Sequence, residues 1–305
     1  MTATARSFLS VADLSPEELA RVLDLSEAPV ATPLLAGKGV ALVFEHPSAR
    51  TRNACEMAVV QLGGHPLSIR AEEIGLDTRE TAEDVARTLA CYHSVVTARV
   101  ARHSTLERMR SAVTTGTKPV PVVNLLSDRE HPTQALADLL TIRQRFGRLE
   151  GLTLAYVGDA NNVCRSLVGA AALAGVRARV SSPAGYCLSD GDLGWASGLG
   201  GDVEAVSDPE EAVAGADVVY TDVWVSMGQN AEADAKRVAL QAFRVDERLL
   251  SRAPEAIVLH CLPAHRGEEI SAGVLDGPQS AVWQQAENRM HSIRGLLRFL
   301  LGEGG

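Results

Sequence analysis

Short apolar runs alternate along the whole chain with segments of helical periodicity. The run Gly39–Phe44 is continuous and rich in β-forming residues, which is typical of a strand buried on both faces of a parallel sheet. Apolar residues then recur at i, i+3, i+4 and i+7 between Cys55 and Leu62, and this spacing predicts a helix that ends at Gly63-Gly64. The pattern therefore predicts a strand, a loop and a helix as the first unit of the fold.

The same alternation continues to the C-terminus. Ser15 to Glu18 have the sequence of a capping box with proline at the first helical position, and Ser104 to Glu107 have the sequence of a second box, so we predict that helices begin at both places. The remaining predicted strands are Ser94–Val100, Pro119–Leu126, Leu152–Val157, Ala178–Ser181, Ala216–Thr221 and Ala256–His260, and the remaining predicted helices include Pro132–Phe146 and Gln284–Leu301.

Alternating strands and helices predict an α/β fold of two doubly wound parallel-sheet domains, with the active site in the cleft between them. The length of 305 residues agrees with two domains of about 150 residues each. We expect a first domain over residues 1–147 and a second over 148–284, with a C-terminal helix, 285–305, that packs back on the first.

Composition and charge narrow the classes of partner. The net charge is −9 without a basic block, which argues against nucleic acid and anionic membranes as partners. The longest apolar run, near Val168 to Val176, is too short to span a bilayer, and the N-terminus has no apolar signal core. The five cysteines form no CxxC pair and lie near no histidine cluster, so we predict a cytoplasmic protein with no disulfide framework and no metal site.

Functional residues should follow the strands, because open α/β sheets bind ligands beyond the carboxyl ends of their strands. Ser48 to Arg52 lie where a strand gives way to a helix, so backbone N–H groups, hydroxyls and guanidinium groups can meet an anion there. The string indicates a phosphate site, although a capped helix with surface arginines explains these residues about equally well. Arg99 follows another strand and supplies a further cation.

Two further polar loops suit small substrates. His131 and Gln134 flank a helix start, and together they suit a planar group with a carbonyl and an NH₂, while simple helix capping explains the same residues. Asp222, with Ser226 and Met227, offers a carboxylate and a hydroxyl without a cation, which fits an amine; a loop-capping role for Asp222 is equally compatible.

Cys261 follows the last predicted strand, where a thiol is usually buried and inert. His260 and His265 lie close enough in sequence to lower its pKa. The turn Gly158-Asp159-Ala160 lacks the three glycines of a dinucleotide-binding loop, so only the strand–helix alternation supports a nucleotide-binding oxidoreductase.

Taken together, the polar strings resemble the aspartate/ornithine carbamoyltransferase family over nearly the whole chain. They are Ser-x-Arg-Thr-Arg at 48–52, Arg99, His-Pro-Thr-Gln at 131–134, Asp-x-Asn-Asn at 159–162, Asp-x-x-x-Ser-Met-Gly-Gln at 222–229, His-Cys-Leu-Pro-Ala-His-Arg-Gly-Glu-Glu at 260–269 and Ala-Glu-Asn-Arg at 286–289. Ser226-Met227-Gly228 and His260–Pro263 are similar to the ornithine branch. The resemblance implies transfer of the carbamoyl group from carbamoyl phosphate to the side-chain amine of L-ornithine, giving L-citrulline and phosphate in arginine metabolism.

The resemblance also implies a role for each matching residue. Carbamoyl phosphate would be bound by Ser48, Ala49, Arg50, Thr51, Arg99, His131, Gln134, Cys261, Leu262 and Arg289. Ornithine would be bound by Asn162, Asp222, Ser226 and Met227, and the catalytic residues would be Arg99, His131, Asp222 and Cys261, with the cysteine orienting rather than attacking. The Leu262-Pro263 peptide is typically cis in the family, and members are typically homotrimers or multiples of trimers that need no metal or organic cofactor.

Three positions depart from the family pattern. Ala49 removes a hydroxyl from the Ser-Thr-Arg-Thr-Arg string, His46 replaces a common lysine, and Gly75 stands where the family places a Gln or His that reaches the neighbouring subunit's site. These departures leave open an enzyme for another amine such as putrescine, or a non-catalytic regulator that binds carbamoyl phosphate. Aspartate is a poor acceptor, because its carboxylate calls for a cation where this sequence has Asp222.

Overall fold

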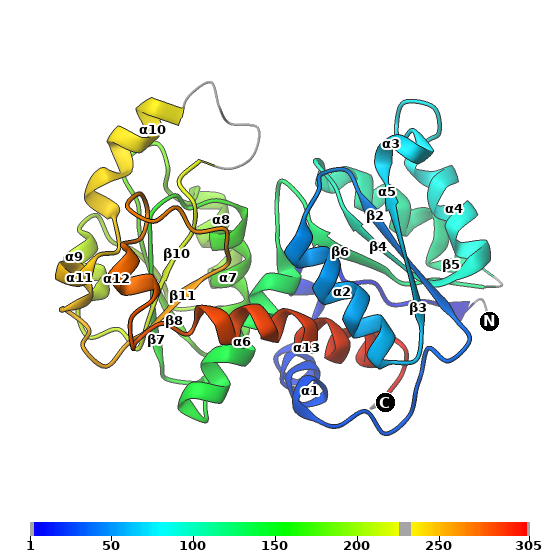
Figure 1. Cartoon of the computed structure of the whole chain (residues 1–305), viewed down its shortest axis with the longest axis horizontal. Helices are drawn as coiled ribbons and strands as arrows, with labels where there is room; N and C mark the ends of the chain where they lie inside the picture. Colours follow the sequence, from blue (N-terminus) through cyan, green and yellow to red (C-terminus); the bar gives the residue numbers. More distant parts are fainter. Residues whose placement is uncertain (1–2, 117, 226–232, 304–305) are drawn as a thin grey trace. The chain divides into compact units, whose positions relative to one another are not determined.

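The computed structural model describes residues 3–116, 118–225 and 233–303. The chain forms two compact units, one of residues Met1–Ala137 with Glu287–Gly305 and one of residues Asp138–Ala286. Both are α/β units built on parallel sheets (Figure 1). The two boundaries lie inside helices, within α6 (Pro132–Phe146) and within α13 (Val282–Leu300).

The first unit has a four-stranded parallel sheet in the order β3-β2-β4-β6. Its strands are β2 (Gly39–Phe44), β3 (His65–Arg70), β4 (His93–Arg99) and β6 (Val122–Leu126). The short strands β1 (Ala3–Thr4) and β5 (Thr115–Gly116) pair antiparallel in a separate sheet.

Helices cover both faces of this first sheet. They are α1 (Pro16–Glu27), α2 (Ala49–Gln61), α3 (Ala71–Ile74), α4 (Ala82–Tyr92) and α5 (His103–Val113), with a 3₁₀ turn η1 at Val11–Asp13. Ala41 and Val43 of β2 pack against α4 and α5, and the alternate residues face α2, as the two-residue period of a strand requires. Arg298 of α13 donates to backbone carbonyls at the end of α1, so the C-terminal part of α13 packs within this unit.

The second unit has a five-stranded parallel sheet in the order β11-β10-β7-β8-β9. Its strands are β7 (Thr153–Val157), β8 (Arg177–Ser181), β9 (Val203–Ala205), β10 (Val218–Thr221) and β11 (Ile257–His260). Its helices include α7 (Asn162–Leu173), α8 (Asp190–Gly198), α9 (Pro209–Val213), α10 (Ala233–Leu240), α11 (Glu247–Leu250) and α12 (Ala272–Leu275), with a 3₁₀ turn η3 at Gln241–Phe243. Residues of α9 to α12 form an apolar core with β7, β10 and β11, and α7 is buried from Val163 to Leu173.

Each sheet has a point where the strand order reverses. In the first unit the chain runs from β2 to β3 on one side and then continues to β4 on the other, and in the second unit the reversal lies between β7 and β10. Ligands of open α/β sheets bind where the loops diverge at such a point. The structure therefore directs attention to the loops after β2, β4, β7 and β10.

Several predicted elements agree with the structure. The strand Gly39–Phe44 and the helix Pro132–Phe146 have the predicted bounds, and the capping box at Ser15 forms. No helix among the described residues is long and apolar enough to cross a membrane.

Three local predictions are wrong, each for an identifiable reason. The helix predicted from Ser104 forms as α5, but the capping box there does not: α5 begins at His103, whose backbone N–H donates to the Asp128 carboxylate at 2.8 Å. The strand predicted from Pro119 begins at Val122, because prolines lack the N–H that a sheet needs. The third difference is β3, which was not predicted because this edge strand contains Pro66 and lacks a continuous apolar run.

Candidate active site

The residues predicted to bind an anion lie at the start of α2 in the first unit. Ser48 occupies the N-cap position, and its hydroxyl accepts a hydrogen bond from the Thr51 backbone N–H at 3.4 Å. Arg50 is exposed beside this helix end, whereas Thr51 is buried. Backbone donors at a helix start and a nearby guanidinium group are the components of an anion site. Ala49 is exposed at the first helical position.

His131 lies at the centre of a group of cations. Its side chain is buried just before α6, and Arg99, at the end of β4, is buried as well. Burial lowers the pKa of His131 well below its usual value, and the positive charges of Arg289, Arg99 and Arg50 lower it further. The imidazole is therefore neutral, so the positive charge at this site belongs to the arginines.

Arg289 of α13 links two of the predicted substrate-binding side chains. Its guanidinium donates to Gln134 Oε1 and, at 3.2 Å, to Thr51 Oγ1. Arg289 and Gln134 are both buried. A residue more than 150 positions away from Gln134 in the sequence thus joins the same cluster.

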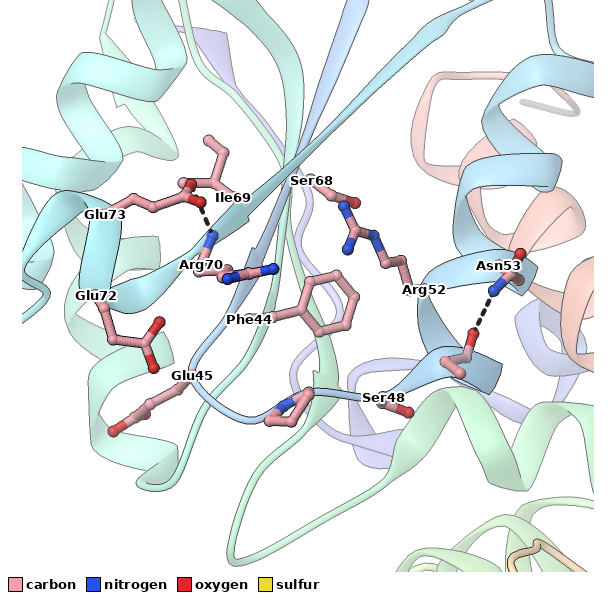
Figure 2. Close-up of a pocket in the computed structure, with 12 residues that line it drawn as sticks. Phe44, Glu45, Ser48, Arg52, Asn53, Ser68, Ile69, Arg70, Glu72 and Glu73 are labelled. Carbon is pink, nitrogen blue, oxygen red and sulfur yellow. Dashed lines mark hydrogen bonds between the residues drawn. The ribbon is translucent and has the colours of Figure 1, made fainter.

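A cavity of about 730 Å³ opens beside the α2 start (Figure 2). Ser48 and Ala49 line it together with Glu45, Arg70 and residues of β3 and α3. Arg52 also lines it, but donates to Glu56 at 3.0 Å. Arg52 therefore serves an ion pair on α2, whereas Arg50 adds its charge to the His131 cluster.

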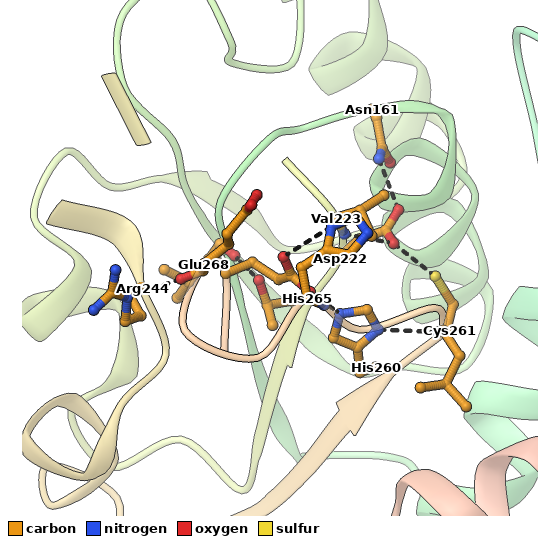
Figure 3. Close-up of polar contacts among 12 residues, drawn as sticks. Asn161, Asp222, Val223, Arg244, His260, Cys261, His265 and Glu268 are labelled. Atoms are coloured by element: carbon orange, nitrogen blue, oxygen red, sulfur yellow. Dashed lines mark hydrogen bonds and ion pairs between the residues drawn. The ribbon is translucent and has the colours of Figure 1, made fainter. Parts of the chain in front are cut away.

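In the second unit Asp222 is the centre of a compact polar cluster (Figure 3). Its Oδ2 accepts from Asn161 Nδ2 at 2.8 Å, and its Oδ1 accepts from the Val223 backbone N–H at 2.8 Å and from Cys261 Sγ at 2.9 Å. Thr221 and His260 are register partners in the parallel pair of β10 and β11, so the next residues on the two strands lie side by side. This register explains why Asp222 meets Cys261.

The sequence analysis assigned a substrate role to Asn162 and none to Asn161. Asn162 is the first residue of α7 and is partly buried. Asn161 caps α7 through its Oδ1 and also donates to Asp222, so it fixes the carboxylate to the helix start. An Asn before an apolar helical run is the usual signal of an N-cap, but its contact with Asp222 depends on the strand order and has no local signal.

A buried ion pair reinforces the same loop. Lys236 Nζ of α10 lies 2.7 Å from Asp159 Oδ2, and both side chains are buried. Burial raises the pKa of Asp159, and the hydrogen bond from Lys236 opposes this rise. The pair attaches α10 to the loop after β7, and the sequence analysis did not identify Lys236.

Cys261 and Leu262 follow β11 in an unusual backbone conformation. The Leu262-Pro263 peptide bond is cis, as the resemblance implies. Cys261 contributes its thiol hydrogen to Asp222, while His260 Nδ1 accepts from the Leu262 backbone N–H and His260 Nε2 lies 3.0 Å from Glu269 Oε1. His265 is exposed and lies near Glu269, so both histidines serve the loop around the cysteine.

Two of the predicted ornithine-binding residues, Ser226 and Met227, lie outside the described residues. Gly75, one of the departures, has a local structural reason. It ends α3 with φ of 65°, a left-handed conformation that favours glycine, and a Cβ there would lie 2.6 Å from Arg79 Cβ. The local backbone therefore favours glycine at this position.

Comparison with protein families matches both units. The carbamoyl-P binding domain of aspartate/ornithine carbamoyltransferase matches residues 6–144, and the Asp/Orn binding domain matches residues 150–300. The chain belongs to the aspartate/ornithine carbamoyltransferase family. The residues around Arg50 and His131 lie in the carbamoyl-P match, and the Asp222 cluster lies in the Asp/Orn match.

Relatives and solved structures extend this family assignment. The chain is 49% identical to the ornithine carbamoyltransferase of a Parafrankia species, covering 98% of this chain and 97% of the relative, and 49% identical to that of Acidothermus cellulolyticus, covering 98% of both. The ornithine carbamoyltransferase structure from Pyrococcus furiosus is 40% identical with a TM-score of 0.91 over 99% of both chains. The Thermus thermophilus structure of the same name is 42% identical with a TM-score of 0.87, covering 97% of this chain and 99% of the other.

Proposed function

We propose that this protein transfers the carbamoyl group of carbamoyl phosphate to the side-chain amine of L-ornithine, giving L-citrulline and phosphate. Relatives 40–49% identical over nearly the whole chain are named for this activity. The observation that carries the proposal is the buried polar cluster of the first unit: Arg289 donates to Gln134 and Thr51, and its charge acts with that of Arg99 on the buried His131.

The first unit binds carbamoyl phosphate in this proposal. The start of α2 and Arg50 hold the phosphate, because helix N-termini and guanidinium groups are both strong phosphate ligands. Arg99 and His131 donate hydrogen bonds to the carbamoyl oxygen. Gln134 orients the carbamoyl group, and Arg289 fixes Gln134 by donating to its side-chain oxygen, Oε1.

The second unit binds ornithine. Asp222 is a buried carboxylate that already gathers donors from Asn161 and Cys261, so a substrate amine finds an acceptor with a fixed orientation. Asn162, Ser226 and Met227 complete the proposed ornithine site, and Cys261 acts as an orienting group. No covalent enzyme intermediate is needed for this role.

The reaction is a direct displacement at the carbamoyl carbon. The neutral side-chain nitrogen of ornithine attacks that carbon, and the bond from the carbon to the phosphate oxygen breaks. The departing phosphate accepts the proton that the nitrogen loses. Arg99 and His131 stabilise the negative charge that develops on the carbamoyl oxygen, and one such donor contributes about 10²- to 10³-fold in rate.

An assay of citrulline formation tests the proposal. The purified protein is given carbamoyl phosphate with ornithine, putrescine, lysine or aspartate in parallel, and we expect product with ornithine. The Arg99→Ala variant, purified in the same way, shows whether any product comes from this protein or from a host enzyme. Product with putrescine alone would indicate that the acceptor is a diamine. Binding of carbamoyl phosphate without any product would indicate a non-catalytic regulator.

We also propose that the protein is cytoplasmic and forms a trimer, on the basis of the family resemblance. Met57 and Val60 on α2 and Leu67 on the adjoining β3 are 44–50% exposed, and apolar side chains on neighbouring elements suit a subunit interface. Light scattering after gel filtration should give three times the chain mass of 32.3 kDa or a multiple of that value. A monomer would contradict this proposal.

A further inference from the structure

His260 is fully buried in the second unit, and three of its polar atoms are engaged. Its backbone N–H donates to Gln285 Oε1 at 2.8 Å, and Gln285 Nε2 donates in turn to Asp138 Oδ1 at 2.7 Å. Its ring contacts Glu269 on one side and the Leu262 backbone on the other. The ring is therefore held in one orientation.

The two ring contacts also define the tautomer. Leu262 donates its backbone N–H to Nδ1 at 2.9 Å, so Nδ1 carries no hydrogen. Nε2 then carries the hydrogen and donates it to Glu269 Oε1, at 3.0 Å, where Glu269 is also fully buried. Glu269 Oε1 accepts from the His265 backbone N–H as well, at 2.5 Å, so the carboxylate is fixed from two sides.

The backbone conformation of Leu262 has to be stabilised by its surroundings. Its φ is 62°, in the left-handed region that residues with a Cβ seldom occupy, and such conformations persist where the surroundings hold them. The bond from the Leu262 N–H to Nδ1 fixes the peptide plane between Cys261 and Leu262. The family resemblance implies that Cys261 and Leu262 bind carbamoyl phosphate, and within the proposed function we assign this backbone segment to its NH₂.

We propose that His260 is a positioning residue that orients the Cys261–Leu262 backbone toward the carbamoyl NH₂, through the acceptor at Nδ1. The inference rests on the proposed function for the identity of the ligand. It adds that the acceptor at Nδ1, rather than the imidazole as a whole, orients the Cys261–Leu262 backbone. Glu269 contributes by keeping the hydrogen on Nε2.

Two substitutions separate the two ring nitrogens. Asn at 260 places an oxygen where Nδ1 lies, and an Asn side chain readily accepts from the backbone N–H two residues on, as in Asx turns. Gln at 260 places its amide nitrogen near the position of Nε2 and retains the donor to Glu269. His260→Asn therefore keeps the contact with Leu262, and His260→Gln keeps the contact with Glu269.

Calorimetry provides the test, because carbamoyl phosphate has the NH₂ and inorganic phosphate lacks it. We expect His260→Gln to lower the affinity for carbamoyl phosphate about tenfold relative to that for phosphate, the typical loss of one well-placed hydrogen bond. His260→Asn should keep the wild-type ratio of the two affinities. Glu269→Gln, which retains an acceptor for Nε2, is the matched control and should also keep the ratio.

The thermal midpoints of the variants are measured in parallel. Each His260 variant loses one buried contact, so similar midpoints with different affinity ratios would separate positioning from general loosening of the fold. An unchanged ratio in His260→Gln, or an equal fall in both His260 variants, would overturn the inference. The citrulline assay of the wild type tests the proposed function separately, since the ratio of affinities does not depend on transfer to ornithine.

Discussion

The two units have the same kind of parallel sheet and place their candidate residues at the same kind of strand reversal, yet the charges there are opposite. In the first unit Arg50, Arg99 and Arg289 act on a histidine that burial keeps neutral. In the second unit a buried carboxylate, Asp222, gathers neutral donors. The fold thus supplies a position, and the side chains at that position decide which substrate charge it accepts.

The two clusters also differ in how the sequence encodes them. Ser48, Arg50 and Thr51 lie within one turn of α2, so a short motif specifies most of the phosphate site. Asn161, Asp222 and Cys261 come from three separate loops and meet only because β7, β10 and β11 are neighbours. Substitutions in the two units should therefore have different signatures, and four experiments test this expectation.

The largest effect should come from Asp222→Asn in the second unit. The substitution keeps the shape but removes the charge, and its NH₂ group then faces one of the donors that Asp222 accepts from, Asn161, Val223 or Cys261. We expect citrulline formation to fall at least about 10²-fold, with carbamoyl phosphate affinity retained. Asp190→Asn, at an exposed position of the same unit, is the control and should remain active. Full activity of Asp222→Asn would contradict the proposal that the second unit binds the substrate amine through Asp222.

Arg50→Ala should instead weaken the binding of carbamoyl phosphate and phosphate by the first unit. A charge-assisted hydrogen bond contributes about 1.5–3 kcal/mol, so we expect carbamoyl phosphate and phosphate to bind more weakly by that amount. Arg87→Ala removes the same charge from an exposed ion pair with Asp84 and should leave both affinities unchanged. Calorimetry on the two folded variants measures both affinities. If Arg50→Ala bound carbamoyl phosphate and phosphate as tightly as Arg87→Ala does, the assignment of Arg50 to the phosphate would be refuted.

The low pKa of His131 predicts a dependence of stability on pH. In the unfolded chain a histidine takes up a proton near pH 6.5, whereas folded His131 resists protonation, so the unfolded state binds more protons as the pH falls. When the pH is lowered from 7.5 to 5.5, His131 should therefore lower the free energy of unfolding of the wild type by about 1.4 kcal/mol.

Urea titrations of the wild type and of His131→Gln at both pH values check this number. The other histidines contribute to both proteins, so the difference between the two pH slopes isolates His131. Parallel slopes would show that folded His131 takes up a proton as readily as the unfolded chain does, which would contradict a neutral histidine among arginines.

The smallest expected effect concerns Ala49, the departure within the phosphate site. Ala49→Thr restores a hydroxyl at the first position of α2, and a neutral hydrogen bond should strengthen phosphate and carbamoyl phosphate binding by about 0.5–1.5 kcal/mol. Ala49→Val has a similar shape without the hydroxyl and is the matched control. Weaker binding by the Thr variant would indicate that the site has changed its geometry around Ala49.

Much of the fold could be predicted because its signals are local. The strand Gly39–Phe44 and the helix Pro132–Phe146 have the predicted bounds, since burial on both faces leaves a continuous apolar run and a proline at the first helical position indicates a helix start. Edge strand β3 escaped prediction because partial exposure leaves no such run. The start of α5 escaped it because Asp128, which follows a different strand, accepts from its first N–H group.

The sequence by itself determined the alternation of strands and helices, the strings after the strands and the residue types available for an anion and an amine. Only the tertiary structure decided which of those residues meet. The register of β10 with β11 brings Asp222 to Cys261, α13 brings Arg289 to Gln134 and Thr51, and burial makes His131 neutral among cations. The physical reason is that charge state, hydrogen-bond partner and backbone conformation depend on neighbours that are distant in sequence, and strand order determines those neighbours.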